Sequence, residues 1–204
     1  MTIILSILIL VVSVVVHEVS HGVVADRLGD PTARFAGRLT LNPLKHLDPL
    51  GSILVPLTLV VSGAPFVFGW AKPVPYNPYN LSDRRWGPAL VGLAGPLSNI
   101  SLAVLFGLAI RWGDTGGPFL QALGPIFVLI IFINLVLALF NLIPIPPLDG
   151  SKLVYALLPA RYLRAYAQLE TFGFIIVIGL LYVFGGQLLS RPVTLLFRLI
   201  TGIG

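Results

Sequence analysis

Residues 17–22 of the chain read His-Glu-Val-Ser-His-Gly, with two histidines four positions apart and a glutamate directly after the first. On an α-helix this spacing puts the imidazoles of His17 and His21 on one face, where both can bind the same zinc ion. Glu18 lies roughly 100° further round the helix, beside the metal and not on it. There a carboxylate can act as general base toward a water molecule that zinc activates. The pattern therefore predicts a zinc-dependent hydrolase with Glu18 as its catalytic base.

The sequence around this pattern is strongly apolar. The sixteen residues before His17 contain no ionisable side chain. Ionisable residues inside a membrane span are costly and usually functional. The alternative is a helix that ends at the membrane surface, with two idle histidines, because Asp26 and Arg27 follow closely. The spacing together with Glu18 favours the metal site.

A catalytic zinc site usually has three protein ligands, so a third is expected. The remaining histidine is His46, and the acids in or beside later apolar runs are Asp114, Asp149 and Glu170. Asp149 follows a proline-rich stretch that cannot continue a helix and can turn the carboxylate back toward the bilayer. The alternative for Asp149 is an ordinary Asp-Gly turn in a surface loop. We expect Asp149 to be the third ligand and His46 to be a solvated loop residue.

The composition predicts the elements that must position these residues. The chain has 204 residues, of which 56% are hydrophobic and 10% charged, whereas soluble domains have about 25% charged residues. Four apolar stretches approach the length of about 20 residues that a spanning helix needs: 2–25, 87–111, 119–142 and 170–190. We therefore expect an all-α integral membrane protein, a polytopic helical bundle that forms a single membrane-embedded domain over residues 1–204.

The segments between these stretches have their own signals. Residues 34–41 alternate roughly between polar and apolar side chains, which predicts a short surface β-hairpin. The proline-rich residues 69–86 predict an extended loop. Residues 191–203 are too short to span and are typical of an amphipathic helix in the interface.

A shared metal ion constrains the topology. If His17, His21 and Asp149 meet, the helices 87–111 and 119–142 form an out-and-back pair. The apolar segment 49–68 then makes no net crossing: it is re-entrant, or it crosses and the loop after it returns. On this topology the Lys and Arg side chains divide ten to three between the two faces. Because cytoplasmic loops carry the excess of basic residues, the metal site is expected toward the cytoplasm.

Several motifs together resemble the site-2 protease family of intramembrane zinc metalloproteases. They are His17-Glu18-Val-Ser-His21, Ala94-Gly-Pro-Leu-Ser-Asn99, and Asn141 through Leu148-Asp149-Gly150, with Leu41-Asn-Pro-Leu44 and Gly69-Trp-Ala-Lys-Pro-Val-Pro75 typical of a compact prokaryotic branch. The resemblance covers residues 10–155.

This resemblance implies functions for particular residues. It implies one zinc ion per chain on His17, His21 and Asp149, Glu18 as the residue that activates water, and Asn141 as a substrate contact. It further implies a cell-membrane zinc metalloendopeptidase that cuts membrane-anchored proteins in regulated intramembrane proteolysis. A strand near residues 34–41 would hold the unwound substrate by edge pairing.

Other functions fit the sequence less well. The net charge of +5 has no basic stripe with interleaved aromatic residues, so we expect lipid and protein partners and no nucleic acid. A metal transporter using His17, His21 and Asp149 as a transit site is the main alternative, but helices 87–111 and 170–190 offer few polar residues for a path. An inactive relative would not need Glu18. The sequence does not indicate an oligomeric state.

Overall fold

The computed structural model describes residues 2–63, 69–112, 117–184 and 187–203, and this part of the chain is helices joined by loops. The longer helices are α1 (Thr2–Arg27), α4 (Gly87–Arg111), α5 (Gly117–Asn141), α7 (Ala160–Phe184) and α8 (Gln187–Thr201). The shorter ones are α2 (Thr32–Phe35), η1 (Pro43–Lys45), the π-helix η2 (Pro49–Leu54), α3 (Val55–Val61), η3 (Pro78–Asn80) and α6 (Gly150–Leu157).

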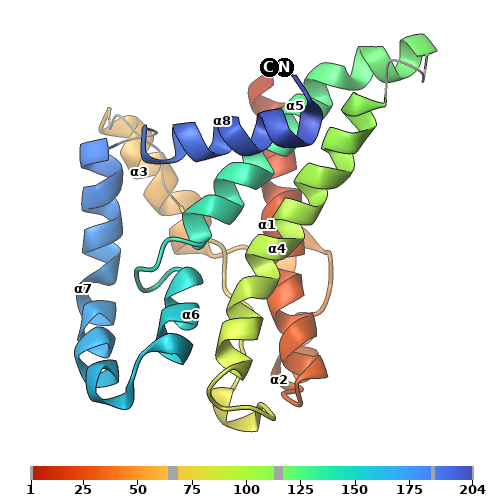
Figure 1. The fold of residues 1–204 in the computed structure, drawn as a ribbon. Coiled ribbons are helices and arrows are strands. Elements are labelled where there is room, and N and C mark those ends of the chain that lie inside the picture. Colours follow the sequence, from red (N-terminus) through yellow and green to blue (C-terminus); the bar gives the residue numbers. More distant parts are fainter. Residues whose placement is uncertain (1, 64–68, 113–116, 185–186, 204) are drawn as a thin grey trace.

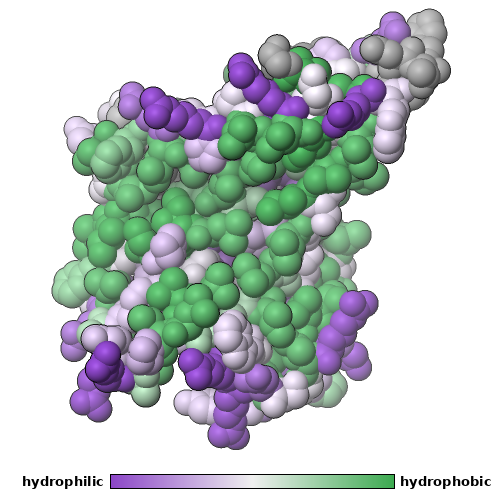
Figure 2. Space-filling model, viewed as in Figure 1, coloured by the Kyte–Doolittle hydropathy of each residue, from purple (hydrophilic) through white to green (hydrophobic). Residues whose placement is uncertain are grey.

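Within these described residues, four helices are long and apolar enough to cross a membrane, as expected for an all-α membrane protein. Three of them, α1, α4 and α5, begin and end within two residues of the predicted bounds. The fourth, α7, begins ten residues earlier than predicted, because Arg161 and Arg164 conceal its first turns in the sequence, and it ends at Phe184 and not at residue 190. Figure 2 shows an apolar belt between two polar ends.

Helix α4 lies at the centre of the bundle and packs against α1, α5, α6 and α8 (Figure 1). Small residues on α4 allow this close approach. A Cβ added at Gly92 would meet the Lys152 side chain, and one at Gly107 would meet Ile200 of α8. The main core cluster joins Ala103 of α4 to Ile131 and Leu135 of α5 and Val193 of α8.

The prediction of a β-hairpin at residues 34–41 is wrong. The segment begins as the end of α2 and continues as a loop, and the described residues contain no strand. Gly37 has a φ of 63°, which interrupts an extended run. Arg38 is buried and donates hydrogen bonds to the carbonyl oxygens of Lys72 and Pro73. The few alternating residues were too short a pattern to specify a strand.

The apolar segment at residues 49–68 is helical over 49–61, and residues 64–68 lie outside the described part. In Figure 1, α3 rises to the same end of the bundle as the last turn of α7, and residues 69–86 return to the start of α4. The re-entrant segment is therefore not supported: Pro49 and Pro56 begin short helical turns that continue to that end. The proline-rich loop begins beside Gly51, where the backbone N–H of Trp70 bonds to its carbonyl oxygen, and leads from there to α4.

Asp30 ties the end of α1 to the loop that precedes α4. Its side chain is fully buried and accepts hydrogen bonds from the backbone N–H of Asn77 at 2.6 Å and from the Asn80 amide at 2.9 Å, as well as from Thr32. Burial alone would raise the pKa of Asp30, but these hydrogen bonds outweigh it and hold this pKa below its ordinary value.

We predict that Asp30→Asn lowers thermal stability in detergent at pH 7, by about 1–3 kcal/mol, because buried donors lose their ionised acceptor. The contribution of Asp30 is fully present above its unfolded-state pKa of about 3.9 and is lost as the pH falls through the lower folded-state pKa. The melting temperatures of wild type and Asp30→Asn should therefore converge below about pH 4. A gap that stays constant from pH 7 to pH 3 would contradict this explanation.

Candidate metal centre

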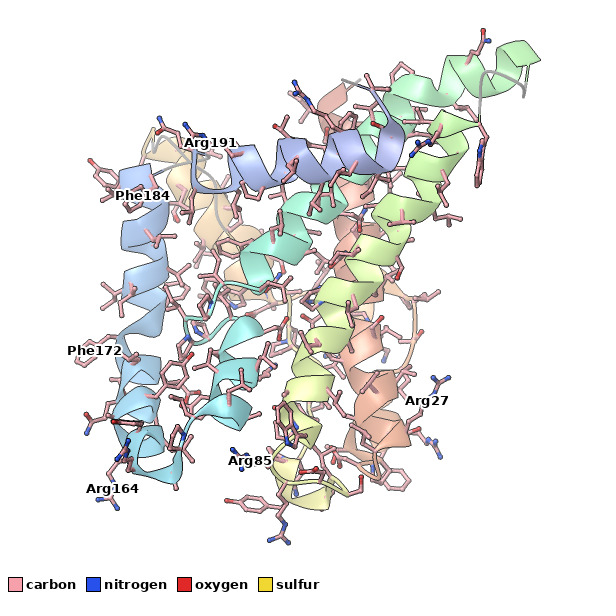
Figure 3. The ribbon with its side chains drawn as sticks, viewed as in Figure 1. Arg27, Arg85, Arg164, Phe172, Phe184 and Arg191 are labelled. Carbon is pink, nitrogen blue, oxygen red and sulfur yellow. The ribbon has the colours of Figure 1, made fainter. Side chains whose placement is uncertain are left out.

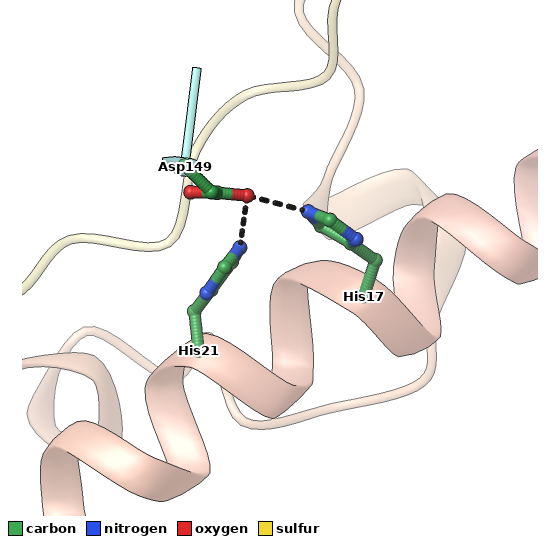
Figure 4. Close-up of side chains that lie close together, drawn as sticks. All are labelled: His17, His21 and Asp149. Atoms are coloured by element: carbon green, nitrogen blue, oxygen red, sulfur yellow. Dashed lines mark hydrogen bonds and ion pairs between the residues drawn. The ribbon is translucent and has the colours of Figure 1, made fainter. Parts of the chain in front are cut away.

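Two elements far apart in the sequence meet at the candidate metal centre. Helix α1 carries His17 and His21 one turn apart, and Asp149 stands directly before the first residue of α6. The Asp149 Oδ2 atom lies 3.1 Å from His17 Nε2 and 3.2 Å from His21 Nε2 (Figure 4). All three side chains are buried, and their ligand atoms lie within 4.8 Å of one another. Two imidazole nitrogens and one carboxylate oxygen are a typical ligand set for catalytic zinc.

The tautomer of His17 is set by Asn99 of α4. The Asn99 Nδ2 atom donates to the Ser13 carbonyl oxygen and to Asn134 Oδ1, so its Oδ1 atom must be the acceptor toward His17 Nδ1, 2.6 Å away. His17 therefore carries its proton on Nδ1 and leaves the Nε2 lone pair for a metal ion.

His21 is oriented in the same way by a backbone group. Its Nδ1 atom lies 2.6 Å from the carbonyl oxygen of Val91, which can only accept. The proton of His21 is therefore also on Nδ1, and its Nε2 lone pair faces Asp149. Both histidines are thus preset as metal ligands by contacts on their far side.

Gly95 of α4 leaves the space that a metal ion and its open position need. A Cβ built at this residue would lie 2.5 Å from both Nε2 atoms, far inside van der Waals contact. The glycine thus keeps backbone and side-chain carbon away from the ligand atoms. Ligand chemistry, proton placement and space all fit a zinc ion.

Asp149 is held as a carboxylate by its neighbours. The positive charge of Lys152 favours the ionised form of this buried carboxylate. The Lys152 Nζ atom donates to Asp149 Oδ1 at 2.8 Å and lies 5.6 Å from the centre of the Tyr76 ring. Lys152 thereby occupies one carboxylate oxygen and leaves Oδ2 for the metal.

Glu18 is positioned by a loop that the sequence alone did not connect to it. The backbone N–H of Val74 donates to Glu18 Oε2 at 2.9 Å. Pro73 and Pro75 have no N–H, so Val74 supplies the one amide donor of this three-residue run. The Glu18 side chain is partly exposed, as a base that meets substrate must be.

The other candidate residues lie apart from this cluster. The Asn141 amide bonds back to the Leu137 carbonyl oxygen within α5. The prediction that His46 is solvated is wrong: its side chain is buried, and Nε2 lies 2.8 Å from the Thr40 carbonyl oxygen. Glu170 is exposed on α7, and Asp114 lies outside the described residues.

A buried polar network behind His17 was missed by the sequence reasoning. Besides Asn99, it contains Asn134 of α5 and Ser13 of α1, joined by the Asn134 Nδ2 to Ser13 Oγ bond of 2.9 Å. Each is at most 2% exposed. The available signal was an amide within the apolar stretch of each of the two helices, because such residues inside a membrane form hydrogen bonds across helices.

We predict that Asn99→Leu weakens zinc binding by about 10- to 100-fold, as is typical when a partner behind a ligand is removed. The His17 ring would lose the acceptor that fixes its tautomer. Competition with a chromophoric chelator measures the affinity. Asn134→Leu is the matched control, because it removes a neighbouring amide that does not touch His17. Equal losses in the two variants would argue against the tautomer explanation.

These apolar helices and this ligand set are typical of a membrane-embedded zinc enzyme. The sequence profile of "Peptidase family M50" matches residues 117–185, which include Asp149. YwhC of Bacillus subtilis (strain 168), a proposed zinc metalloprotease, is 43% identical over 84% of this chain and 77% of its own length. The chain therefore belongs to the M50 peptidase family, the site-2 proteases, and is a metalloprotease hydrolase.

Further relatives carry the same description. Proposed zinc metalloproteases named Rip2 are 34% identical in Mycolicibacterium smegmatis and 31% identical in Mycobacterium tuberculosis strain H37Rv. Each match covers 83% of this chain and 63% of the relative, so the chain spans a little under two thirds of their length. No solved structure matches the chain. Family membership favours the protease over the metal transporter.

Proposed function

We propose that this protein hydrolyses peptide bonds of membrane-anchored proteins inside the bilayer or at its edge. The observation that carries the proposal is that His17 and His21, on a helix long enough to span, meet Asp149 beside Glu18. Arg27, at the end of α1, lies ten positions after His17, which corresponds to about 15 Å along the helix. The hydrocarbon core is about 30 Å thick, so a ligand at this depth favours cleavage within the membrane.

His17, His21 and Asp149 would hold one zinc ion per chain. Zinc in such a site polarises the substrate carbonyl and lowers the pKa of a bound water molecule toward about 7. Glu18 takes a proton at its carboxylate during the attack on the carbonyl carbon and returns it to the departing amine nitrogen. The Val74 N–H keeps this carboxylate oriented between the two transfers. Asn141, at the end of α5, would contact the unwound substrate, as the family resemblance implies.

We further propose that the protein lies in the cell membrane with its metal site toward the cytoplasm. The side with ten basic residues supports this orientation; it holds Arg27, Arg34, Arg38, Lys45, Lys72, Arg84, Arg85, Lys152, Arg161 and Arg164. In Figure 3, Arg27, Arg85 and Arg164 lie at one end of the bundle and Arg191 at the other. Residues 1–204 would act as a single domain in regulated intramembrane proteolysis.

The test is cleavage of a single-span reporter protein reconstituted with the purified enzyme in lipid vesicles. We expect cutting within the apolar segment, mapped by mass spectrometry of the products, that stops on chelation and returns with zinc. Asp149→Asn should abolish it, whereas Asp26→Asn, which removes a carboxylate paired with Arg34 at the surface, should not. Cleavage confined to water-exposed loops, or unaffected by chelation, would refute the proposal. Zinc flux across the same vesicles without cleavage would favour a transporter.

A further inference from the structure

Helix α8 runs across the end of the bundle that lies opposite Arg27, Arg85 and Arg164 (Figures 1 and 3). It presents three distinct faces. One face packs on α4 and α5 through Val193 and the partly buried residues Leu189, Leu196, Phe197 and Ile200. The second face is exposed and apolar, with Leu195 at 60% and Leu199 at 64% exposure. The third face is exposed and polar, with Ser190, Arg191, Thr194 and Arg198.

Among the described residues, the positive charge of the polar face has no counterion. Neither Arg191 nor Arg198 forms an ion pair within the described residues, and residues 187–203 contain no acidic side chain. Asp114, in the connection between α4 and α5, lies outside the described residues. The hydroxyl protons of Ser190 and Thr194 are used within the helix, on the carbonyl oxygens of Gln187 and Ser190. The guanidinium groups are therefore the donors available to a ligand.

The two arginines stand one above the other along the helix and flank a shallow hollow of about 320 Å³. Its lining includes Leu195 as well as Ser190, Arg191, Thr194 and Arg198. A cationic stripe directly beside an apolar stripe matches a molecule with a phosphate at one end and acyl chains at the other. A free phosphate ion would leave Leu195 and Leu199 without a partner.

We propose that the exposed side of α8 is a binding site for an anionic phospholipid. The headgroup phosphate lies between Arg191 and Arg198, and an acyl chain follows Leu195 and Leu199. Arginines at headgroup level attract anionic lipids, and a helix with one apolar flank in the lipid keeps them at that level. The inference does not depend on the proposed proteolysis, because α8 contributes no residue to the metal centre.

The test compares lipid retention by the purified protein in nanodiscs that contain equal amounts of phosphatidylglycerol and phosphatidylcholine. Native mass spectrometry counts the lipids that stay bound after release into detergent. We expect wild type to prefer phosphatidylglycerol by about tenfold or more, given the attraction of two basic side chains. Arg191→Gln with Arg198→Gln should reduce the preference to near unity, and lysine at both positions should keep most of it.

Two controls separate this site from general attraction to basic residues. Arg161→Gln with Arg164→Gln removes two exposed arginines from the start of α7 and should leave the preference intact. An equal loss in that variant would overturn the proposal, as would equal retention of both lipids by wild type. Displacement of the bound lipid by inorganic phosphate at equal concentration would show a simple anion site instead.

Discussion

Glu18→Gln should leave zinc bound and reduce cleavage by about 10²- to 10⁴-fold, the usual contribution of a general base. Glutamine has the same shape, and its carbonyl oxygen can still accept the Val74 N–H, so the fold around α1 is kept. It cannot take a proton from the attacking water. Zinc content by plasma mass spectrometry and the initial rate on the membrane-anchored reporter measure the two effects.

The matched control for this variant is Glu170→Gln. Glu170 is an exposed acid on α7 that lines a pocket with Lys152 but is not part of the cluster of metal ligands. Its neutralisation should therefore leave zinc content unchanged and reduce cleavage far less than Glu18→Gln. Undiminished cleavage by Glu18→Gln would refute its assignment as the base. Loss of zinc together with activity would instead make Glu18 part of the metal-binding set.

A single methyl group at residue 95 should abolish zinc binding. In Gly95→Ala the new Cβ would lie 2.5 Å from His17 Nε2 and from His21 Nε2. Neither imidazole can move aside freely, because Asn99 and the Val91 carbonyl oxygen hold the opposite edge of each ring. We expect zinc affinity to fall more than about 100-fold, beyond the upper range for the loss of a supporting contact, and cleavage to fall with it.

The effect should be confined to the metal. Alanine is a better helix former than glycine, so α4 should not lose helical content in circular dichroism. Gly124→Ala on α5 is the control, because nothing lies within 4 Å of its added Cβ. Normal zinc affinity in Gly95→Ala would mean that the ion sits elsewhere.

The helices with uninterrupted apolar sequence were the part of the fold that could be predicted. Length and composition are sufficient for α1, α4 and α5, because a spanning helix must bond all its backbone groups internally. The predicted start of α7 was wrong, because its first turns carry the charged residues Arg161 and Arg164. The alternation of polar and apolar side chains at residues 34–41 led to the wrong prediction of a hairpin. The structure has one turn of helix and a glycine at positive φ there.

In the candidate site, too, some features could be predicted from the sequence and others could not. Helical spacing alone places His17 beside His21, and proline chemistry suggested that Asp149 could reach them. The supporting contacts could not be predicted, because they join segments with no local signal for each other. The Val74 N–H reaches a glutamate 56 positions away, and Asn99 reaches a histidine 82 positions away. Such partners depend on how helices cross, which a single sequence does not encode locally.

The run Pro73-Val74-Pro75 has a consequence for how a peptide can lie in this enzyme. Its one amide hydrogen is committed to Glu18, and the Arg38 guanidinium covers the carbonyl oxygens of Lys72 and Pro73. A peptide that lay along this run would find this amide and the carbonyl oxygens of Lys72 and Pro73 already in use. The position of the substrate at the bond to be cut would then depend on how its side chains fit the enzyme. We therefore expect the enzyme to select substrates by the size of their side chains more than by their backbone conformation.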